Sequence, residues 1–153
     1  MNAFHSELAA KLNALMEDVP YQTANLANAS ALLWQELPDI NWVGFYQLLG
    51  DRLVLGPFQG KPACIQIPLG KGVCGKAAAE ERVLRVENVH AFPGHIACDS
   101  ASNSEIVLPV YRRGKIWGVL DIDSPLFSRF TPEDEAQLGQ ISELLGKMLS
   151  GTE

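Results

Sequence analysis

Residues 115–123 read KIWGVLDID, and this stretch decides the fold. Side chains of a β-strand point alternately to its two faces. One face is therefore predicted to carry Trp117, Val119, Asp121 and Asp123, and the other Ile116, Leu120 and Ile122. Neither set has the polar composition of a solvated surface. The stretch is predicted to be a buried strand in a sheet that is covered on both sides.

The neighbouring segments add further strands to this sheet. A strand over 105–111 is predicted to pair with 115–123 through a turn at 112–114, and 40–49 is predicted to form a hairpin with 52–58 around Gly50 and Asp51. Two short strands are expected over 64–67 and 82–86. Because most of these strands are joined by hairpins, the sheet is expected to be mostly antiparallel.

Helical patterns lie at both ends of the chain. Apolar residues recur at helical spacing over 4–19 and 22–36, and Thr131 followed by Pro132 marks the start of a helix that continues to about residue 149. The glycine-rich segment 70–79 is predicted to be a turn that enters a short helix. The fold class is therefore α+β, with the terminal helices on one sheet face and loops and the short helix over a ligand pocket on the other. With no repeat or linker visible, residues 1–153 are expected to form one domain.

Charge and hydropathy narrow the class of function. The 153-residue chain has a net charge of −6 and one basic cluster, Arg112, Arg113 and Lys115, which argues against nucleic-acid binding. No apolar run reaches the ~20 residues that cross a bilayer, and the N-terminus lacks a signal-like segment. A cytoplasmic location is therefore expected. The terminal helices could form the interface of a homodimer.

Three acidic residues are predicted to come together in the covered sheet. Asp121 and Asp123 end one strand, and Glu105 begins its neighbour. Buried carboxylates are unfavourable unless a cation or hydrogen-bond donors meet them. The simplest interpretation is that the two aspartates cap the next turn. Otherwise the cluster predicts a bound ammonium group, a carboxyl group that keeps its proton, or a hard metal ion.

A first strand supplies aromatic residues. Trp42, Gly44 and Tyr46 are predicted on one face, with Val43 and Phe45 on the other. Trp42 and Tyr46 beside a glycine could form an aromatic wall with space above it. Ordinary core packing is the alternative interpretation.

The spacing of the three cysteines differs from that of a zinc finger, because the sequence contains no Cys-x2-Cys pair. His90 and His95 near Cys98 could complete a metal site, but loop histidines are more often solvated. Cys98 lies in the irregular segment 88–103, where a thiolate can be exposed. Cys74 lies near a predicted helix N-terminus, which also favours a thiolate, whereas Cys64 fits a plain core residue. Two thiols in predicted loops or turns, Cys98 and Cys74, together with the third, suit a cycle in which one cysteine is oxidised and another then forms a disulfide with it.

These motifs together resemble a known family. Residues 42–46 (WVGFY), 70–75 (GKGVCG), 95–99 (HIACD), 104–110 (SEIVLPV) and 118–124 (GVLDIDS) closely resemble the free methionine-(R)-sulfoxide reductases, which are built on a GAF-type domain. The resemblance extends from the second helix to the last and includes all three cysteines.

The resemblance implies an oxidoreductase that converts free L-methionine-(R)-sulfoxide to methionine without a bound cofactor or metal. Cys98 would attack the substrate and become oxidised. Cys74 or Cys64 would then form a disulfide with Cys98, and thioredoxin would reduce this disulfide. The acidic residues and the aromatic wall described above would form the substrate pocket, and one of Glu105, Asp121 and Asp123 would protonate the sulfoxide oxygen. The alternative is a GAF-type sensor that binds a small molecule without chemistry.

Overall fold

The computed structural model describes residues 3–96 and 101–152, with side chains from residue 7 onward. One antiparallel sheet contains six strands in the order β3-β2-β1-β6-β5-β4. The strands are β1 (Trp42–Leu49), β2 (Arg52–Gly60), β3 (Gln66–Pro68), β4 (Leu84–Val86), β5 (Ser104–Arg112) and β6 (Lys115–Ser124). The helices are α1 (Ala3–Met16), α2 (Gln22–Glu36), α3 (Gly72–Glu80) and α4 (Pro132–Ser150), with a short 3-10 helix at Val89–Ala91.

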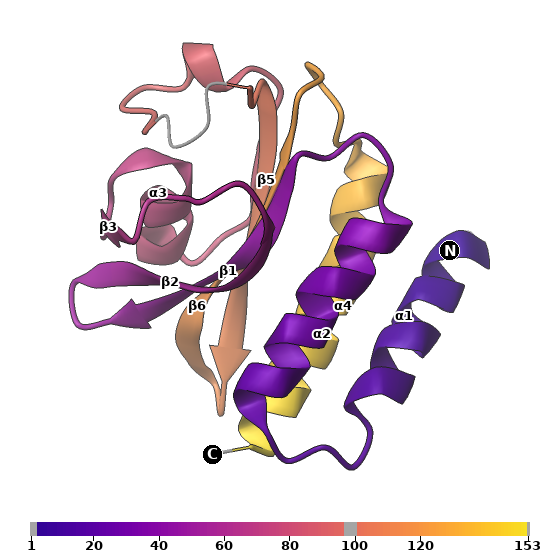
Figure 1. The fold of residues 1–153 in the computed structure, drawn as a ribbon. Coiled ribbons are helices and arrows are strands. Elements are labelled where there is room, and N and C mark those ends of the chain that lie inside the picture. The colour runs from indigo at the N-terminus through magenta and orange to yellow at the C-terminus, as the bar shows by residue number, and fades with distance from the viewer. Residues whose placement is uncertain (1–2, 97–100, 153) are drawn as a thin grey trace.

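Helices α2 and α4 lie side by side on one face of the sheet, and α1 packs on their outer side (Figure 1). Leu33 of α2, Leu145 of α4 and Phe45 of β1 are fully buried between these layers. Helix α4 begins with a capping box, in which the Thr131 side chain accepts from the Asp134 amide and the Asp134 side chain accepts from the Thr131 amide. The predicted α+β class, the hairpins and this helix start are confirmed. The homodimer stays a prediction.

The prediction for Trp117 is wrong. Its side chain packs in the core on the helix side, edge-on to Phe45 at 6.3 Å between ring centroids, whereas Val119 lies in the core on the opposite face. The cause is a β-bulge. Val110 pairs with Gly118 but Tyr111 pairs with Ile116, so Trp117 is an extra residue in β6 and the alternation reverses there.

The other sheet face is covered by α3 and the segment that follows β4 (Figure 1). Val107 and Val119 of the sheet meet Ala77 of α3 in a second apolar core, and all three are fully buried. This second core supports the region in which the predicted site residues lie. None of the helices in the described part of the chain is long and apolar enough to cross a membrane.

Candidate active site

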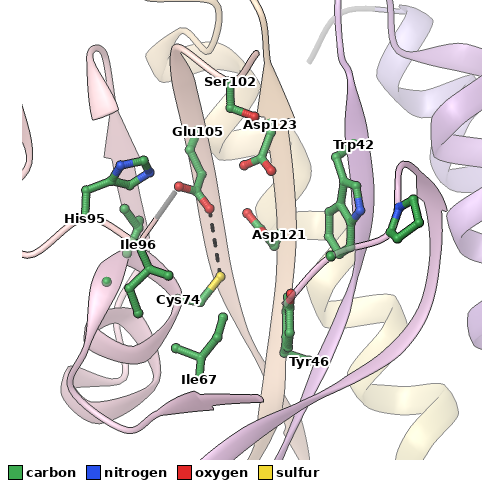
Figure 2. Close-up of a pocket in the computed structure, with 14 residues that line it drawn as sticks. Trp42, Tyr46, Ile67, Cys74, His95, Ile96, Ser102, Glu105, Asp121 and Asp123 are labelled. Carbon is green, nitrogen blue, oxygen red and sulfur yellow. Dashed lines mark hydrogen bonds between the residues drawn. The ribbon is translucent and has the colours of Figure 1, made fainter. Parts of the chain in front are cut away.

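A pocket opens between the sheet and α3, on the face away from the long helices (Figure 2). Its floor comes from β1, β5 and β6, one side from the start of α3, and its rim from segments before β3 and after the 3-10 helix. The lining residues are Trp42, Tyr46, Pro62, Ala63, Ile67, Gly72, Val73, Cys74, His95, Ile96, Ser102, Glu105, Asp121 and Asp123. Every predicted site residue in the described part of the chain except Cys64 is among them. No lysine or arginine of that part lines the pocket.

Strand pairing brings the three predicted acids together. Glu105 of β5 pairs with Asp123 of β6, and Asp121 lies on the same face two residues before Asp123. Glu105 and Asp121 are 7% and 5% exposed, and Asp123 is half-buried. Figure 2 shows all three carboxylates pointing into the same space. The sequence predicted this convergence correctly, because strand alternation and hairpin pairing together determine which side chains share a face of the sheet.

The environment opposes ionisation of these acids. Burial is the main cause that raises the pKa of Glu105 well above its ordinary value, and the neighbouring Asp121 adds to the shift. The pKa of Asp121 is likewise raised by burial and then by the charge of Asp123. Asp121 Oδ1 is buried and has no hydrogen-bond partner within the described residues. The pocket therefore disfavours the charged forms of Glu105 and Asp121, and within the described residues no donor meets Asp121 Oδ1.

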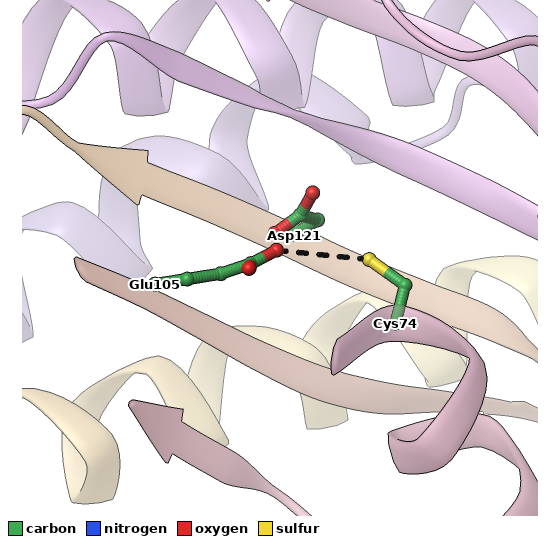
Figure 3. Close-up of side chains that lie close together, drawn as sticks. All are labelled: Cys74, Glu105 and Asp121. Atoms are coloured by element: carbon green, nitrogen blue, oxygen red, sulfur yellow. Dashed lines mark hydrogen bonds between the residues drawn. The ribbon is translucent and has the colours of Figure 1, made fainter. Parts of the chain in front are cut away.

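Cys74 contacts the acid cluster from the third position of α3 (Figure 3). Its thiol donates to Glu105 Oε2 over 3.8 Å, and the side chain is 5% exposed. Burial is the largest cause that raises the pKa of Cys74, followed by the charges of Asp121 and Glu105. The expectation that the helix N-terminus favours a thiolate here is therefore wrong, because desolvation and the adjacent acids outweigh it.

Cys74, Glu105 and Asp121 also form a set that could coordinate a cation. One possible ligand atom from each lies within 4.8 Å of the others. A metal would have to displace the protons that the raised pKa values hold on these groups, whereas an ammonium group donates hydrogen bonds to them.

The predicted aromatic wall is present. Trp42 and Tyr46 are almost fully buried and stack with 5.9 Å between ring centroids, and Trp42 stacks on Phe58 at 5.2 Å. The expected space above the wall is the pocket that Trp42 and Tyr46 line, but it does not extend over Gly44. A Cβ atom there would lie 2.3 Å from the Phe58 Cβ, so the glycine allows Phe58 to approach Trp42. Burial is the main cause that raises the Tyr46 pKa, so its hydroxyl stays protonated.

The aromatic wall also holds the segment that carries Cys64. Trp42 Nε1 donates to the Lys61 carbonyl over 3.1 Å, and the Tyr46 hydroxyl donates to the Cys64 carbonyl over 2.8 Å. Cys64 precedes β3, is half-buried and is disulfide-bonded, while Cys74 is a free thiol. The prediction of Cys64 as a plain core residue in a strand is wrong, because β3 begins only at Gln66.

Cys98, the predicted attacking thiol, lies outside the described residues. The segments on either side of it contribute pocket residues that the sequence did not assign to a substrate pocket. His95 and Ile96 line the pocket before it, and Ser102 lines it afterwards, where its hydroxyl accepts from Asn41 Nδ2 over 3.1 Å. The His95 pKa is lowered, mainly by burial. The signal that the sequence offered was their position close to Cys98, within the segment 88–103 that was predicted to be irregular.

Comparison with known proteins shows extensive similarity. Residues 7–149 match the GAF domain family. The free methionine-R-sulfoxide reductase of Escherichia coli K12 is 57% identical over 150 residues, or 98% of this chain and 91% of the relative.

Solved structures agree with this match. The reduced form of fRMsr from Staphylococcus aureus has a TM-score of 0.92 and 50% identity, covering 95% of this chain and 94% of that chain. The free methionine-R-sulfoxide reductase from Neisseria meningitidis, in complex with its substrate, has a TM-score of 0.93 and 41% identity, covering 97% and 89%.

Proposed function

The chain belongs to the GAF-fold family of free methionine-(R)-sulfoxide reductases, and from this premise we propose that it reduces free L-methionine-(R)-sulfoxide to methionine. Family membership confirms the expected class, an oxidoreductase. The observation that carries the substrate proposal is the convergence of Glu105, Asp121 and Asp123 in a pocket without lysine or arginine within the described residues. A free amino acid has the ammonium group that such a pocket lacks, whereas a methionine inside a peptide does not.

The substrate is proposed to bind with its ammonium group at Asp121. The buried Oδ1 of this residue has no hydrogen-bond partner within the described residues, and an ammonium group supplies both a donor and a positive charge. The substrate carboxylate would face Gly72 and Val73, which line the pocket at the start of α3. The first backbone N–H groups of a helix have no partner within the helix and favour an anion. The side chain would then lie along Trp42.

Glu105 is proposed as the acid that protonates the sulfoxide oxygen. Its raised pKa favours the protonated form, and Glu105 lies at the start of β5, seven residues after Cys98 in the sequence. As Cys98 sulfur attacks the substrate sulfur, the sulfoxide oxygen takes up the proton. The oxygen then passes to the Cys98 sulfur as the S–O bond to the substrate sulfur and the transient bond between the two sulfur atoms break. Methionine leaves, and Cys98 carries the oxygen as a sulfenic acid. The substrate sulfur is reduced by two electrons and the cysteine is oxidised by two.

Cys64 is proposed as the resolving cysteine. Its thiolate would attack the sulfenic sulfur of Cys98, which releases water and forms a disulfide for thioredoxin to reduce. Two observations support Cys64 over Cys74: Cys64 is disulfide-bonded, and Cys74 is a buried thiol whose raised pKa disfavours the thiolate. Cys74 would instead donate its hydrogen bond to Glu105. The proposal needs no bound cofactor or metal, and it places the protein in the cytoplasm, where reduced thioredoxin is maintained.

The experiment that tests the proposal measures methionine formed from each epimer of free methionine sulfoxide and of its N-acetyl derivative, with dithiothreitol as reductant. We expect consumption of the free R epimer and none of the N-acetyl compounds, because acetylation removes the ammonium charge. Metal analysis of the same preparation should show no stoichiometric metal. Binding of the free amino acid by folded, reduced protein without methionine formation would contradict the proposal and favour the sensor function.

A further inference from the structure

We propose that the surface around Cys64 is the docking site for an acidic dithiol reductant of the thioredoxin type, an inference that rests on the proposed function. The Cys64 surface is the exposed part of segment 61–71, which carries Cys64, and it includes Lys61, Pro62, Ile65, Leu69 and Lys71. All five residues are exposed. The surface therefore lies beside a disulfide-bonded cysteine and is open to a second protein.

The apolar part of the Cys64 surface is unusual for a solvated segment. Ile65 directly follows Cys64 and is 74% exposed, more than any other large hydrophobic side chain in the described part of the chain. Leu69 is 37% exposed. Thiol–disulfide exchange brings a partner's sulfur into bonding distance of the attacked sulfur, so the residues around that sulfur are buried in the encounter. Exposed apolar side chains there gain free energy by this burial.

The charge of this surface specifies the partner. Residues 61–71 read KPACIQIPLGK and contain two lysines and no acidic residue, although the chain has a net charge of −6. A locally positive segment on an acidic protein attracts an acidic partner in one orientation and repels a basic one. The partner is therefore expected to present negative charge around an apolar patch that contains its reactive thiol.

The backbone of the Cys64 surface is fixed, so its side chains are presented without much loss of conformational entropy. The Tyr46 hydroxyl donates to the Cys64 carbonyl over 2.8 Å, and the Leu55 amide donates to the Ile65 carbonyl over 3.0 Å. The segment continues into β3, an edge strand of the sheet (Figure 1). A preorganised surface binds more tightly than a mobile one of the same composition. The buried Cys74 offers no comparable access.

The exchange itself balances without another reactant. A partner thiolate attacks the Cys64 sulfur, the disulfide of Cys64 breaks, and its other cysteine leaves as a thiolate. The second thiol of the partner then breaks the mixed disulfide. The partner loses two electrons and becomes a disulfide, and this chain gains two electrons and two protons as two thiols.

The test compares two reductants on the same variants. Ile65→Ser and the double variant K61E/K71E are assayed with thioredoxin, its reductase and NADPH, and separately with dithiothreitol. Tyr21→Ser and Lys115→Glu serve as matched controls, because Tyr21 is 70% exposed and Lys115 is an exposed lysine outside the Cys64 surface. We expect kcat/KM for thioredoxin to fall about tenfold in each test variant, with dithiothreitol-driven turnover unchanged and the controls like wild type. Added salt should lower kcat/KM for thioredoxin in wild type more than in K61E/K71E.

Unchanged thioredoxin kinetics in both test variants would overturn the docking site while leaving the reductase intact. An equal loss with both reductants would also overturn it, because a small dithiol needs no docking surface. If wild type forms no methionine with either reductant, the proposed function fails and the docking proposal fails with it.

Discussion

Replacing Asp121 with asparagine should make the protein more stable and less able to bind its substrate. Asp121 is 5% exposed, its Oδ1 has no hydrogen-bond partner within the described residues, and Glu105 and Asp123 lie beside it. Asparagine has nearly the same shape, cannot ionise, and has an N–H group that can donate a hydrogen bond to the neighbouring carboxyl groups. The substitution therefore relieves an electrostatic conflict that the free protein contains.

The size of the gain follows from the burial of this group. A buried polar group without a partner costs about 1–3 kcal/mol, and 1 kcal/mol corresponds to about 2–4 °C in a domain of this length. We therefore expect Asp121→Asn to raise the melting temperature by about 2–12 °C near neutral pH. Asp51→Asn is the control, because the Asp51 side chain is 86% exposed, and its melting temperature should match that of wild type.

The pH dependence gives a sharper check. The folded-state pKa of Asp121 is raised above its ordinary value of 3.8, so as pH rises the unfolded chain loses this proton before the folded chain does. The stabilising contribution of this group is fully present below its ordinary pKa of 3.8. It is lost as pH rises through the raised pKa that Asp121 has in the folded protein. The advantage of asparagine should thus be smallest near pH 4 and larger at pH 7.

Thermal unfolding followed by circular dichroism at both pH values measures the difference, and substrate titration of the same samples measures affinity. A melting temperature below that of wild type at pH 7, or a gain that does not depend on pH, would refute the electrostatic argument. The affinity for free methionine sulfoxide should fall at least tenfold, because the ammonium group loses its charged partner.

Four further predictions test the site and the fold. Cys98→Ser should abolish methionine formation with any thiol reductant, and retained turnover would exclude Cys98 as the attacking group. Glu105→Gln should lower kcat by about 10²–10⁴-fold, and wild-type activity should decline as pH rises through the raised pKa of Glu105 while the variant stays flat. Tyr46→Phe removes the hydrogen bond to the Cys64 carbonyl, so rapid-quench experiments should show an unchanged first turnover and slower disulfide formation. Thr131→Ala removes the helix cap and should lower the free energy of unfolding by about 1 kcal/mol in urea titrations.

Much of the site could be predicted from local sequence because it depends on strand alternation and hairpin pairing. The turns at Gly50 and Gly114 fix which strands are neighbours, and a period of two fixes which side chains share a face. Glu105, Asp121 and Asp123 therefore converge as predicted. The start of α4 at Thr131 and Pro132 was equally local, since a capping box is complete within four residues.

The tertiary structure decided features that depend on contacts between distant segments. The bulge that turns Trp117 toward the helices arises from pairing between β5 and β6, which the alternating pattern does not contain. The ionisation of Cys74 depends on desolvation by α3 packing on the sheet, and this outweighs the local effect of the helix N-terminus. The space at Gly44 is filled by Phe58 across the hairpin. Periodicity and turn chemistry are encoded by neighbouring residues, whereas burial, register shifts and pKa values arise only once the elements pack together.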